Sequence, residues 1–472
     1  MSTYEEIIGR KERYAPSVGF DHAVDDEWLF PFQRHAVRWA LAGGRRALFM
    51  DTGLGKSRMQ LRWASAVADH TGGRVIILAP LAVGPQTVRE AANVGLSGVV
   101  FAQSPAEMGE ARIIVTNYDS LEKFAAVEFA GVVLDESSIL KSYMGATKLY
   151  IIERFKGTPY KLCATATPAP NDHLELGNHA EFLGILSSHQ MIARWFINDT
   201  SKMGTYRLKG HAVESFWDWV ASWAVCAGLP SDLGAFSDAG YVLPPLELHR
   251  HIVNVDIVSG AKDGALFRLA DMSATNIHAE KRMTTDARAD RVAEIVAGKP
   301  DEAWLVWCET DYEAAALMSR LPAHAYEVSG SMPASVKSER LLRFASDGGI
   351  LVTKPKIAGF GMNYQNCANV AFVGTSYSYE AFYQAVRRCW RFGQARPVNA
   401  YVVLAFTDQS TWDVVSGKAA DHAEMKAQMF AASRRSQARH SSMLDYHPKC
   451  HGRLPTWLVS THPEPEELSC SA

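Results

Sequence analysis

The chain of 472 residues lacks any uninterrupted apolar run long enough to span a bilayer, and its polar, acidic first residues do not form a secretory signal. Its seven cysteines are scattered singly, which favours free thiols in a reducing compartment. The net charge is only −3, so any nucleic-acid contact must be a local basic patch. These absences predict a soluble, cytoplasmic protein with no membrane partner, and the length predicts roughly two to four globular domains.

A glycine-bearing loop between an apolar run and a helical pattern is the most informative motif. The run ends at Met50, and the next seven residues are Asp-Thr-Gly-Leu-Gly-Lys-Ser. Gly53 and Gly55 allow backbone N–H groups to approach a polyphosphate, and Lys56 adds a positive charge near its outer phosphates. Ser57 offers a hydroxyl ligand for Mg²⁺ at a helix N-terminus. The pattern predicts a nucleoside triphosphate site; the alternative is an ordinary glycine-rich turn between a strand and a helix.

Two acids end a later apolar run, in the sequence Val-Val-Leu-Asp-Glu-Ser-Ser at 132–138. Asp135 can hold Mg²⁺ directly or through water, and Glu136 can orient or deprotonate an attacking water. Two acids at a strand end are also a common solvated feature. The phosphate loop upstream favours the catalytic interpretation.

Two hydroxyl side chains end the following run, Leu-Cys-Ala-Thr-Ala-Thr at 162–167. Ligands of parallel sheets bind at the carboxyl ends of the strands. Thr165 and Thr167 are therefore expected to sense the γ-phosphate or to couple it to the second half of the chain. In isolation the segment would be an ordinary strand before a proline turn.

The second half carries two weaker signals. After an apolar run at 350–353 comes Ala-Gly-Phe-Gly-Met-Asn, in which Gly361 and Asn363 suit close approach to a phosphate or sugar. Further on, Gln384, Arg388 and Arg391 would share one helical face at i, i+4 and i+7. Such a face suits a phosphate held across a cleft, although a solvated basic helix is the alternative.

Short apolar runs alternate with helical patterns along most of the chain, such as 56–69, 312–320 and 335–346. Continuous apolar runs of this kind are typical of parallel strands buried on both faces. The pattern predicts an α/β fold with two tandem, doubly wound parallel sheets. The predicted strands are 45–50, 74–79, 98–102, 112–116, 131–135 and 161–164 in the first half, and 303–307, 325–328, 349–353, 369–374 and 399–404 in the second.

The segment between the two series has a different character. Phe216, Trp219 and Trp223 share a helical face, which core packing explains. Just before them, a glycine-punctuated loop holds three basic residues that either contact nucleic acid or are simply solvated: Lys202, Arg207 and Lys209. The predicted domains are 1–172, a mainly helical insertion and linker at 173–290, a second α/β domain at 291–415, and a C-terminal helix and loose tail at 416–472. A Cys/His cluster in the tail lacks a second pair at zinc spacing, so we interpret it as plain tail.

The order of these motifs resembles that of the superfamily-two helicases and translocases (DEAD/DEAH-type), and most closely their Swi/Snf-like branch. The resemblance covers about residues 28–410 and is weak only over the insertion. It implies tandem RecA-like domains, ATP and Mg²⁺ as cofactors, and a compact motor without histone-reading domains, of a size seen in phages and bacteria. It also implies that an arginine of the last motif acts as a finger on the transition state.

The resemblance assigns roles residue by residue. Gln33, in Pro-Phe-Gln-Arg-His, is similar to the residue that reads adenine, and the missing first glycine at Met50 is tolerated by this branch. The ATP-binding set it implies is Gln33, Gly53, Gly55, Lys56, Ser57, Thr165, Thr167, Gly361 and Gln384, with Ser57 and Asp135 on the metal and Glu136, Asp135, Lys56, Arg388 and Arg391 in catalysis. The candidate DNA contacts are Pro80, Thr116, Asn117, Tyr118, Lys202, Arg207, Lys209, Lys356 and Asn363.

Three positions depart from the family pattern. Ser138 stands where an acid or histidine is usual, Trp390 replaces a frequent histidine, and Pro355 precedes the fifth motif. These changes affect coupling more than ATP chemistry. The expected function is an ATP-dependent DNA translocase or helicase, acting on duplex or branched DNA, with repair, recombination or replication proteins as possible partners. The alternatives are a strand-separating or junction-remodelling helicase on DNA or RNA, and an ATP-binding regulatory subunit of a nuclease or repair complex.

Overall fold

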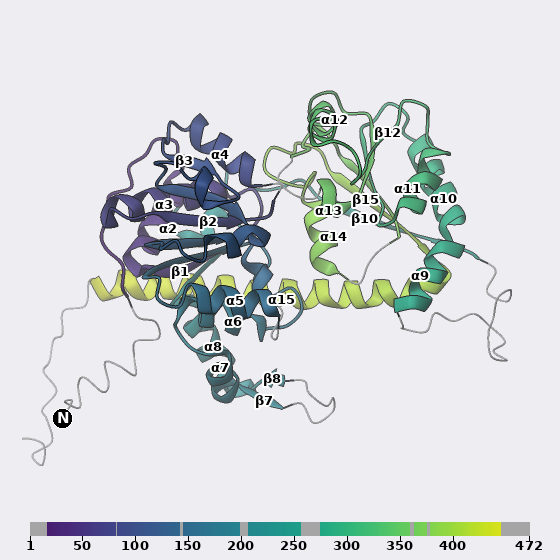
Figure 1. Cartoon of the computed structure of the whole chain (residues 1–472). Helices are drawn as coiled ribbons and strands as arrows, with labels where there is room; N and C mark the ends of the chain where they lie inside the picture. The colour runs from purple at the N-terminus through teal and green to yellow at the C-terminus, as the bar shows by residue number, and fades with distance from the viewer. Residues whose placement is uncertain are drawn as a thin grey trace, which may run out of the picture.

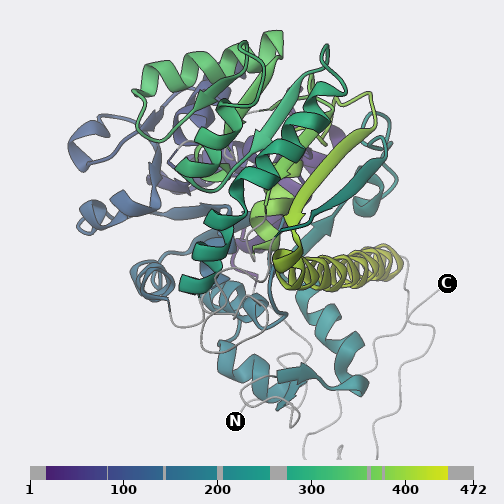
Figure 2. The ribbon, with the colours of Figure 1, turned by 90° about the vertical axis from the view of Figure 1, so that its right-hand side faces the viewer.

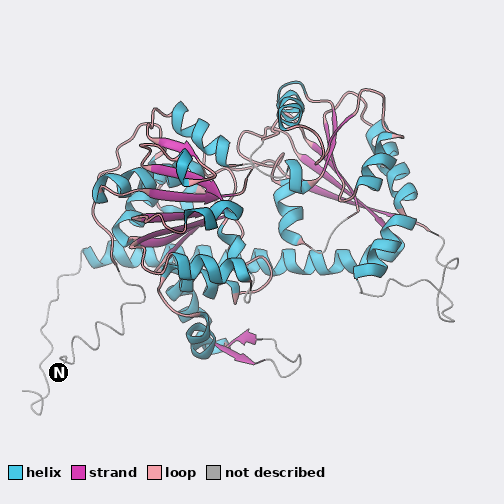
Figure 3. Cartoon of the chain, viewed as in Figure 1, coloured by secondary structure: helices cyan, strands magenta, loops and turns pink. Residues whose placement is uncertain are grey.

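Two α/β lobes lie side by side, with one long helix running beneath both (Figure 1). The computed structural model describes residues 17–81, 83–141, 145–198, 206–255, 274–358, 363–374 and 378–444. The strands gather in two separate sheets, and a small hairpin extends from the first lobe (Figure 3). This arrangement of two tandem parallel-sheet domains confirms the predicted fold class.

The first lobe contains a seven-stranded sheet of order β3-β4-β2-β5-β6-β1-β9. Every neighbouring pair in it is parallel. Its strands are β1 (Arg45–Met50), β2 (Val75–Ala79), β3 (Val99–Phe101), β4 (Ile113–Asn117), β5 (Gly131–Asp135), β6 (Tyr160–Thr165) and β9 (Ala224–Ala227). Its helices are α2 (Pro31–Gly43), α3 (Lys56–Thr71), α4 (Gly84–Asn93), α5 (Ala146–Arg154), α6 (Glu175–Leu183), α7 (Ser188–Trp195) and α8 (Val213–Ala221). A short antiparallel hairpin, β7 (Phe196–Asn198) and β8 (Tyr206–Leu208), extends from α7.

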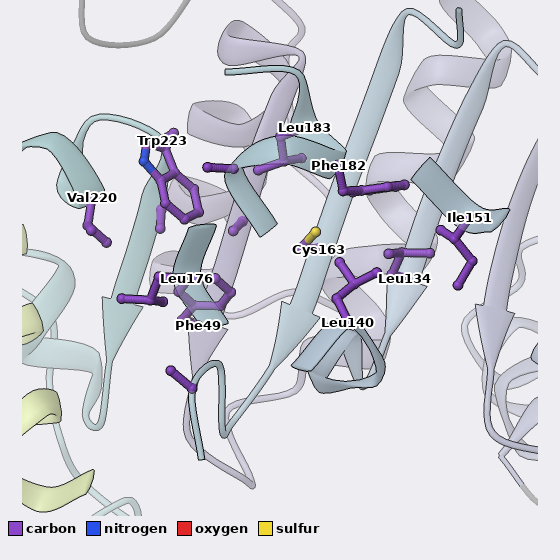
Figure 4. Close-up of a cluster of buried hydrophobic side chains, with 14 of the residues drawn as sticks. Phe49, Leu134, Leu140, Ile151, Cys163, Leu176, Phe182, Leu183, Val220 and Trp223 are labelled. Atoms are coloured by element: carbon purple, nitrogen blue, oxygen red, sulfur yellow. The ribbon is translucent and has the colours of Figure 1, made fainter. Parts of the chain in front are cut away.

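Both faces of this sheet are covered, as continuous apolar strands require. Leu48 belongs to the cluster that α2 and α3 cover, and Phe49 belongs to the cluster beneath α6 and α8. Figure 4 shows Phe49, Leu134 and Cys163, from three neighbouring strands, beside side chains of α6. Burial of each large side chain contributes about 1.5–3 kcal/mol. The sheet is therefore a stiff platform for the loops at its carboxyl edge.

The second lobe contains a six-stranded sheet of order β10-β15-β14-β11-β13-β12, in which every neighbouring pair is also parallel. Its strands are β10 (Leu246–Val253), β11 (Trp304–Trp307), β12 (Tyr326–Val328), β13 (Ile350–Thr353), β14 (Asn369–Val373) and β15 (Val398–Ala405). Its helices are α9 (Ala274–Met283), α10 (Thr285–Ala297), α11 (Asp311–Met318), α12 (Ala334–Asp347), α13 (Pro355–Ala358) and α14 (Tyr379–Val386).

All the strands expected from the sequence are present within a residue or two, but the lobe boundaries differ from those predicted. The segment 173–250 is not only helical, because β9 completes the first sheet and β10 begins the second. The four-residue run of β9 is too short to separate a strand from a helix by periodicity. β10 is a half-exposed edge strand with two histidines and an arginine, so it lacks the apolar run of its neighbours.

Tryptophan packing confirms the predicted core role of the aromatic face in α8. Trp219 stacks on Trp195 with ring centroids 4.7 Å apart and lies 5.4 Å from Trp223. All three rings are buried in the first-lobe core. Aromatic pairs of this kind add about 0.5–1.5 kcal/mol beyond their buried area.

The long C-terminal helix α15 (Gln409–Leu444) joins the two cores. Trp412 and Val415 are buried with the second lobe, and Met425 and Met429 are buried against α8 and β9 of the first. In Figure 2 the helix lies below the second lobe. None of the described helices is long and apolar enough to cross a membrane. The Cys/His cluster of the tail lies outside the described residues.

Candidate nucleotide site

The phosphate loop forms a left-handed turn that only glycine adopts without strain. Gly53 has φ +95° and Gly55 has φ +79°, and Gly55 caps α3, which begins at Lys56. A Cβ at Gly55 would lie 2.2 Å from the Gln33 side chain. The loop therefore presents backbone N–H groups and a helix N-terminus to the same space, as an anion site requires.

Lys56 is held at the base of this loop. Its Nζ donates to the carbonyl oxygens of Met50, at 2.9 Å, and Asp51, at 3.3 Å. Burial lowers the pKa of its ammonium group, while the charges of Glu136 and Asp135 act in the opposite direction. A phosphate oxygen is a better partner for this charge than two carbonyls, so the lysine is poised to exchange them for a ligand.

Gln33 fixes the phosphate loop instead of standing free in the cleft. Its Nε2 donates to the Leu54 carbonyl at 2.9 Å, and its Oε1 accepts from the Phe30 N–H at 3.0 Å. The side chain is 2% exposed. Its expected hydrogen bond to adenine stays a prediction, and the contact to the loop was not foreseen.

The two acids lie at the end of β5, facing the loop. Asp135 accepts a hydrogen bond from Gln60 Nε2 at 2.7 Å, and Glu136 accepts one from Thr165 Oγ1 at 3.2 Å. Burial raises the pKa of both carboxyls, and the negative charge of Asp135 raises that of Glu136 further. A base with a raised pKa takes a proton from water more readily.

Glu136 has a strained backbone. Its φ of +51° is the only positive value among the described non-glycine residues. Such a conformation costs of order 1–3 kcal/mol and persists only where the surroundings impose it. The hydrogen bond from Thr165 and the strand geometry before it hold the carboxylate at the mouth of the cleft.

Arg388 and Arg391 approach the same space from the second lobe. Both line the cleft, and the pKa of Arg388 is lowered by burial while the charge of Glu136 opposes that change. Burial, followed by repulsion from Arg388, lowers the pKa of Arg391 to about 10. Its Nη1 donates to Asn363 Oδ1, so the fifth and sixth motifs meet at the cleft.

These elements enclose a cleft of about 610 Å³, large enough for a nucleotide. Its lining contains predicted residues of both lobes together with one face of α4. The predicted site residues that line this cleft are Gly53, Gly55, Lys56, Ser57, Asp135, Glu136, Asn363, Arg388 and Arg391.

The helical-face prediction for the last motif is wrong in its geometry. α14 ends at Val386, so Arg388 and Arg391 lie in the turns beyond it. They still reach the cleft, whereas Gln384 donates to Glu380 at 3.5 Å and does not line the cleft. Gly361 lies outside the described residues. Thr167 is buried and its N–H donates to Thr165 Oγ1, at 3.1 Å.

Several predicted DNA contacts are either buried in the first lobe or hydrogen-bonded within it. Thr116 and Asn117 are buried, and Tyr118 OH donates to the Asp135 carbonyl at 2.7 Å. Lys209 Nζ donates to the carbonyls of Ala193 and Arg194, at 3.1 and 2.9 Å, near the end of α7. Arg207, on the hairpin, is exposed, and Pro80 is half-buried. Lys202 lies outside the described residues, and Lys356 is placed only as part of α13.

The donor set suits Mg²⁺ with a triphosphate. Ser57 offers a hydroxyl and Asp135 a carboxylate, both on the cleft wall, and magnesium keeps several waters and phosphate oxygens in addition. Within the described ranges no group of three or more His, Cys, Asp or Glu side chains could hold an ion by protein ligands alone.

A second set of residues lies beside the cleft, and its pairings have no local signature in the sequence. Asp51 meets Tyr383, Arg387 and Lys426, and Ser138 meets Glu380, in each case between the first lobe and the second lobe or α15. A pairing between residues hundreds of positions apart leaves no local pattern. Within this set, only the i, i+3 and i+7 spacing of Glu380, Tyr383 and Arg387 can be recognised in the sequence.

Comparison with known proteins gave one family model and a set of solved structures. Residues 287–393, which include Asn363 and both arginines, match the helicase conserved C-terminal domain. A solved structure of the Sulfolobus solfataricus SWI2/SNF2 ATPase core in complex with dsDNA matches at 16% identity with a TM-score of 0.41, over 86% of this chain and 99% of that chain. No curated protein matches the sequence. Residues 287–393 of the second lobe are thus similar to this domain, and the function is inferred from the site itself.

Glu175 links the threonine segment to α6 and predicts a pH dependence of stability. It accepts hydrogen bonds from Asn171 Nδ2 at 2.9 Å and from the Asn171 N–H at 3.2 Å. Burial raises its pKa from 4.5 to about 7, and these hydrogen bonds only partly oppose the rise. Because the folded state holds this proton more tightly, stability falls as pH rises from about 4.5 to about 7, by about 3 kcal/mol, and is constant above.

Melting temperatures at pH 5 and pH 8 test this expectation. Glu175→Gln cannot ionise, so it should lose less stability than the wild type between the two pH values, whatever its constant cost in hydrogen bonding. Glu153→Gln, at an exposed position, is the matched control and should follow the wild type. An equal drop in all three proteins would show that Glu175 is already ionised at pH 5.

Proposed function

We propose that the protein hydrolyses ATP and couples this to movement along nucleic acid, with duplex DNA as the substrate. One observation carries the proposal: Glu136 of the first lobe and Arg388 of the second line the same cleft as the phosphate loop. Catalytic groups divided between two lobes make turnover depend on how the lobes meet. The order of the motifs resembles that of the Swi/Snf-like branch, and this resemblance favours duplex DNA as the substrate.

The first lobe would hold the nucleotide. Lys56 would exchange its carbonyl partners for phosphate oxygens, and the glycine loop would supply backbone N–H donors. Ser57 and Asp135 would hold Mg²⁺, which neutralises charge on the phosphates when it is bound. Gln60 keeps the Asp135 carboxylate oriented toward that position.

Glu136 would orient the attacking water and accept its proton. Thr165 fixes the carboxylate, and burial raises its pKa toward the range in which it acts as a base. Arg388 would meet the negative charge that develops on the transferred phosphoryl group, since it stands close enough to Glu136 for their charges to interact. The second lobe thus completes the site only when it is closed on the first.

Nucleic acid would lie across both lobes, and the protein would contact its phosphates. Such contacts are independent of sequence and weaken with salt. Arg207 stays a candidate contact because it is exposed on the hairpin, whereas Lys209 is better explained by its bonds to α7. Thr116 and Asn117 are buried at the end of β4, so they would affect nucleic-acid binding by holding that strand end in place.

ATP turnover across nucleic-acid substrates tests the proposal. Wild-type protein is expected to hydrolyse ATP slowly alone and several-fold faster with duplex DNA, and less so with single strands or RNA. Unwinding of forked DNA, measured in parallel by strand displacement, would instead indicate a strand-separating helicase. Absence of turnover with every ligand would favour a regulatory ATP-binding subunit and overturn the proposal.

A further inference from the structure

One face of α14 attaches the second lobe to the first at two points. Glu380 and Tyr383 lie on the helix and Arg387 caps it, at the spacing i, i+3 and i+7 that places side chains on one side. Each of the three side chains bonds a residue of the first lobe. We call this set the α14 joint.

At one end of the joint, Asp51 receives three partners. Arg387 Nη2 lies 2.8 Å and Lys426 Nζ 3.3 Å from its Oδ1, and Tyr383 OH donates to the same oxygen. Burial alone would raise the pKa of the Asp51 carboxyl, but Lys426 and Arg387 outweigh it and hold that pKa well below its ordinary value. The carboxylate is therefore ionised throughout the working range of pH.

This end of the joint reaches directly into the phosphate loop. Arg387 also donates to Thr52, through Nε to its hydroxyl and through Nη2 to its carbonyl at 3.3 Å. The Arg387 side chain is only 5% exposed and Asp51 is 18% exposed. Charge-assisted bonds at such shielded positions are stronger than exposed ion pairs.

The opposite charge arrangement occurs at the other end. Glu380 accepts from Ser138 Oγ at 2.7 Å and from Lys141 Nζ at 2.5 Å. Ser138 follows Glu136 by two residues and is the position at which the acidic motif departs from the pattern that it resembles. The joint thus contacts the first lobe at the start of the phosphate loop and again just after the catalytic acid.

We propose that Glu380, Tyr383 and Arg387 are positioning residues that place Arg388 opposite Glu136. Arg387 is bonded to Asp51 and Thr52, and Arg388 is the next residue, so the two ends of the joint fix where its side chain begins. Lys426 brings α15 into the same cluster, through Asp51 and through Tyr383 OH at 3.1 Å. The catalytic part of this inference rests on the proposed function; the attachment of the lobes does not.

Charge reversal at the more accessible end tests the joint. Lys141→Glu should repel Glu380, Glu380→Lys should repel Lys141, and the double variant restores a pair of opposite charge. Lys156→Glu makes the same change in an exposed pair, Lys156–Glu153, and is the matched control. Tyr383→Phe removes only a hydroxyl and serves as a mild variant if a reversal does not fold, as checked by circular dichroism.

Two measurements test the attachment of the lobes and its effect on catalysis separately. The first is the lobe-to-lobe distance of the nucleotide-free protein, by fluorescence energy transfer between dyes on exposed sites of the two lobes. The transfer efficiency should fall in each single reversal and recover in the double variant. The second is duplex-stimulated ATPase, in which kcat should fall about tenfold, equal to about 1.4 kcal/mol, with KM for ATP little changed, and should recover in the double variant.

The outcomes distinguish the two proposals. A fall and recovery of transfer efficiency in a protein without ATPase would support the attachment but remove its catalytic role and the proposed function with it. Unchanged transfer efficiency in both single reversals and in Tyr383→Phe would overturn the joint even if the wild type is an active ATPase. A rise in KM with constant kcat would contradict positioning of Arg388.

Discussion

Replacing Glu136 by glutamine is expected to lower the ATP turnover number about 10³-fold while nucleotide binding is retained. Glutamine keeps the size and the acceptor oxygen for Thr165 but cannot take a proton from water. The side chain is half-buried at the mouth of the cleft, and its residue has the one positive-φ non-glycine backbone among the described residues. Its removal should therefore act on kcat, because Lys56, Ser57 and the glycine loop still hold the nucleotide.

Steady-state turnover with duplex DNA, together with fluorescent-nucleotide binding, measures this effect. Glu122→Gln, an exposed acid of the same lobe, is the matched control and should behave as wild type. Turnover of Glu136→Gln within about tenfold of wild type would show that the base lies elsewhere.

Replacing Arg388 by alanine should lower kcat by about 10³-fold, the size of effect that an arginine finger has in phosphoryl transfer. The half-buried guanidinium enters the cleft from the second lobe, close enough to Glu136 for their charges to interact. Arg391→Ala should also lose turnover, because that arginine lines the same cleft and bonds Asn363. Arg388→Lys keeps the charge but loses the planar donor fork, so it should recover only part of the rate.

Arg250→Ala is the matched control, since Arg250 is an exposed residue of the second lobe, on β10. Both cleft variants should bind nucleotide through the first lobe and show their loss in kcat. If Arg388→Ala retained kcat and lost only affinity, Arg388 would be a binding residue and the finger would have to be Arg391.

The sequence predicts the first-lobe site closely because each part of it is local. A buried strand, a glycine loop and a helix start are read from neighbouring residues, and the same holds for Asp135 and Glu136. The edge strand β10 and the four-residue β9 were missed because one alternates polar residues and the other is too short to show a period. Both errors moved the lobe boundaries without affecting the cleft.

Long-range pairings could not be predicted from the sequence. No local pattern singles out Asp51, which contacts Tyr383 and Arg387 of the second lobe and Lys426 of α15. Ser138 departs from the motif that the sequence resembles, and its hydroxyl donates to Glu380. Arg388 and Arg391 were assigned to the cleft on a helical face, and they reach it from turns beyond α14. Their position in the cleft agrees with the prediction, whereas their backbone conformation does not.

The most direct test of the account is displacement of a third strand from duplex DNA. Wild-type protein with ATP should strip a triplex-forming strand without separating the duplex beneath it, and Glu136→Gln should fail under the same conditions. Displacement that is equally fast without ATP, or vigorous ATP turnover that never displaces the third strand, would contradict movement driven by the two-lobed site.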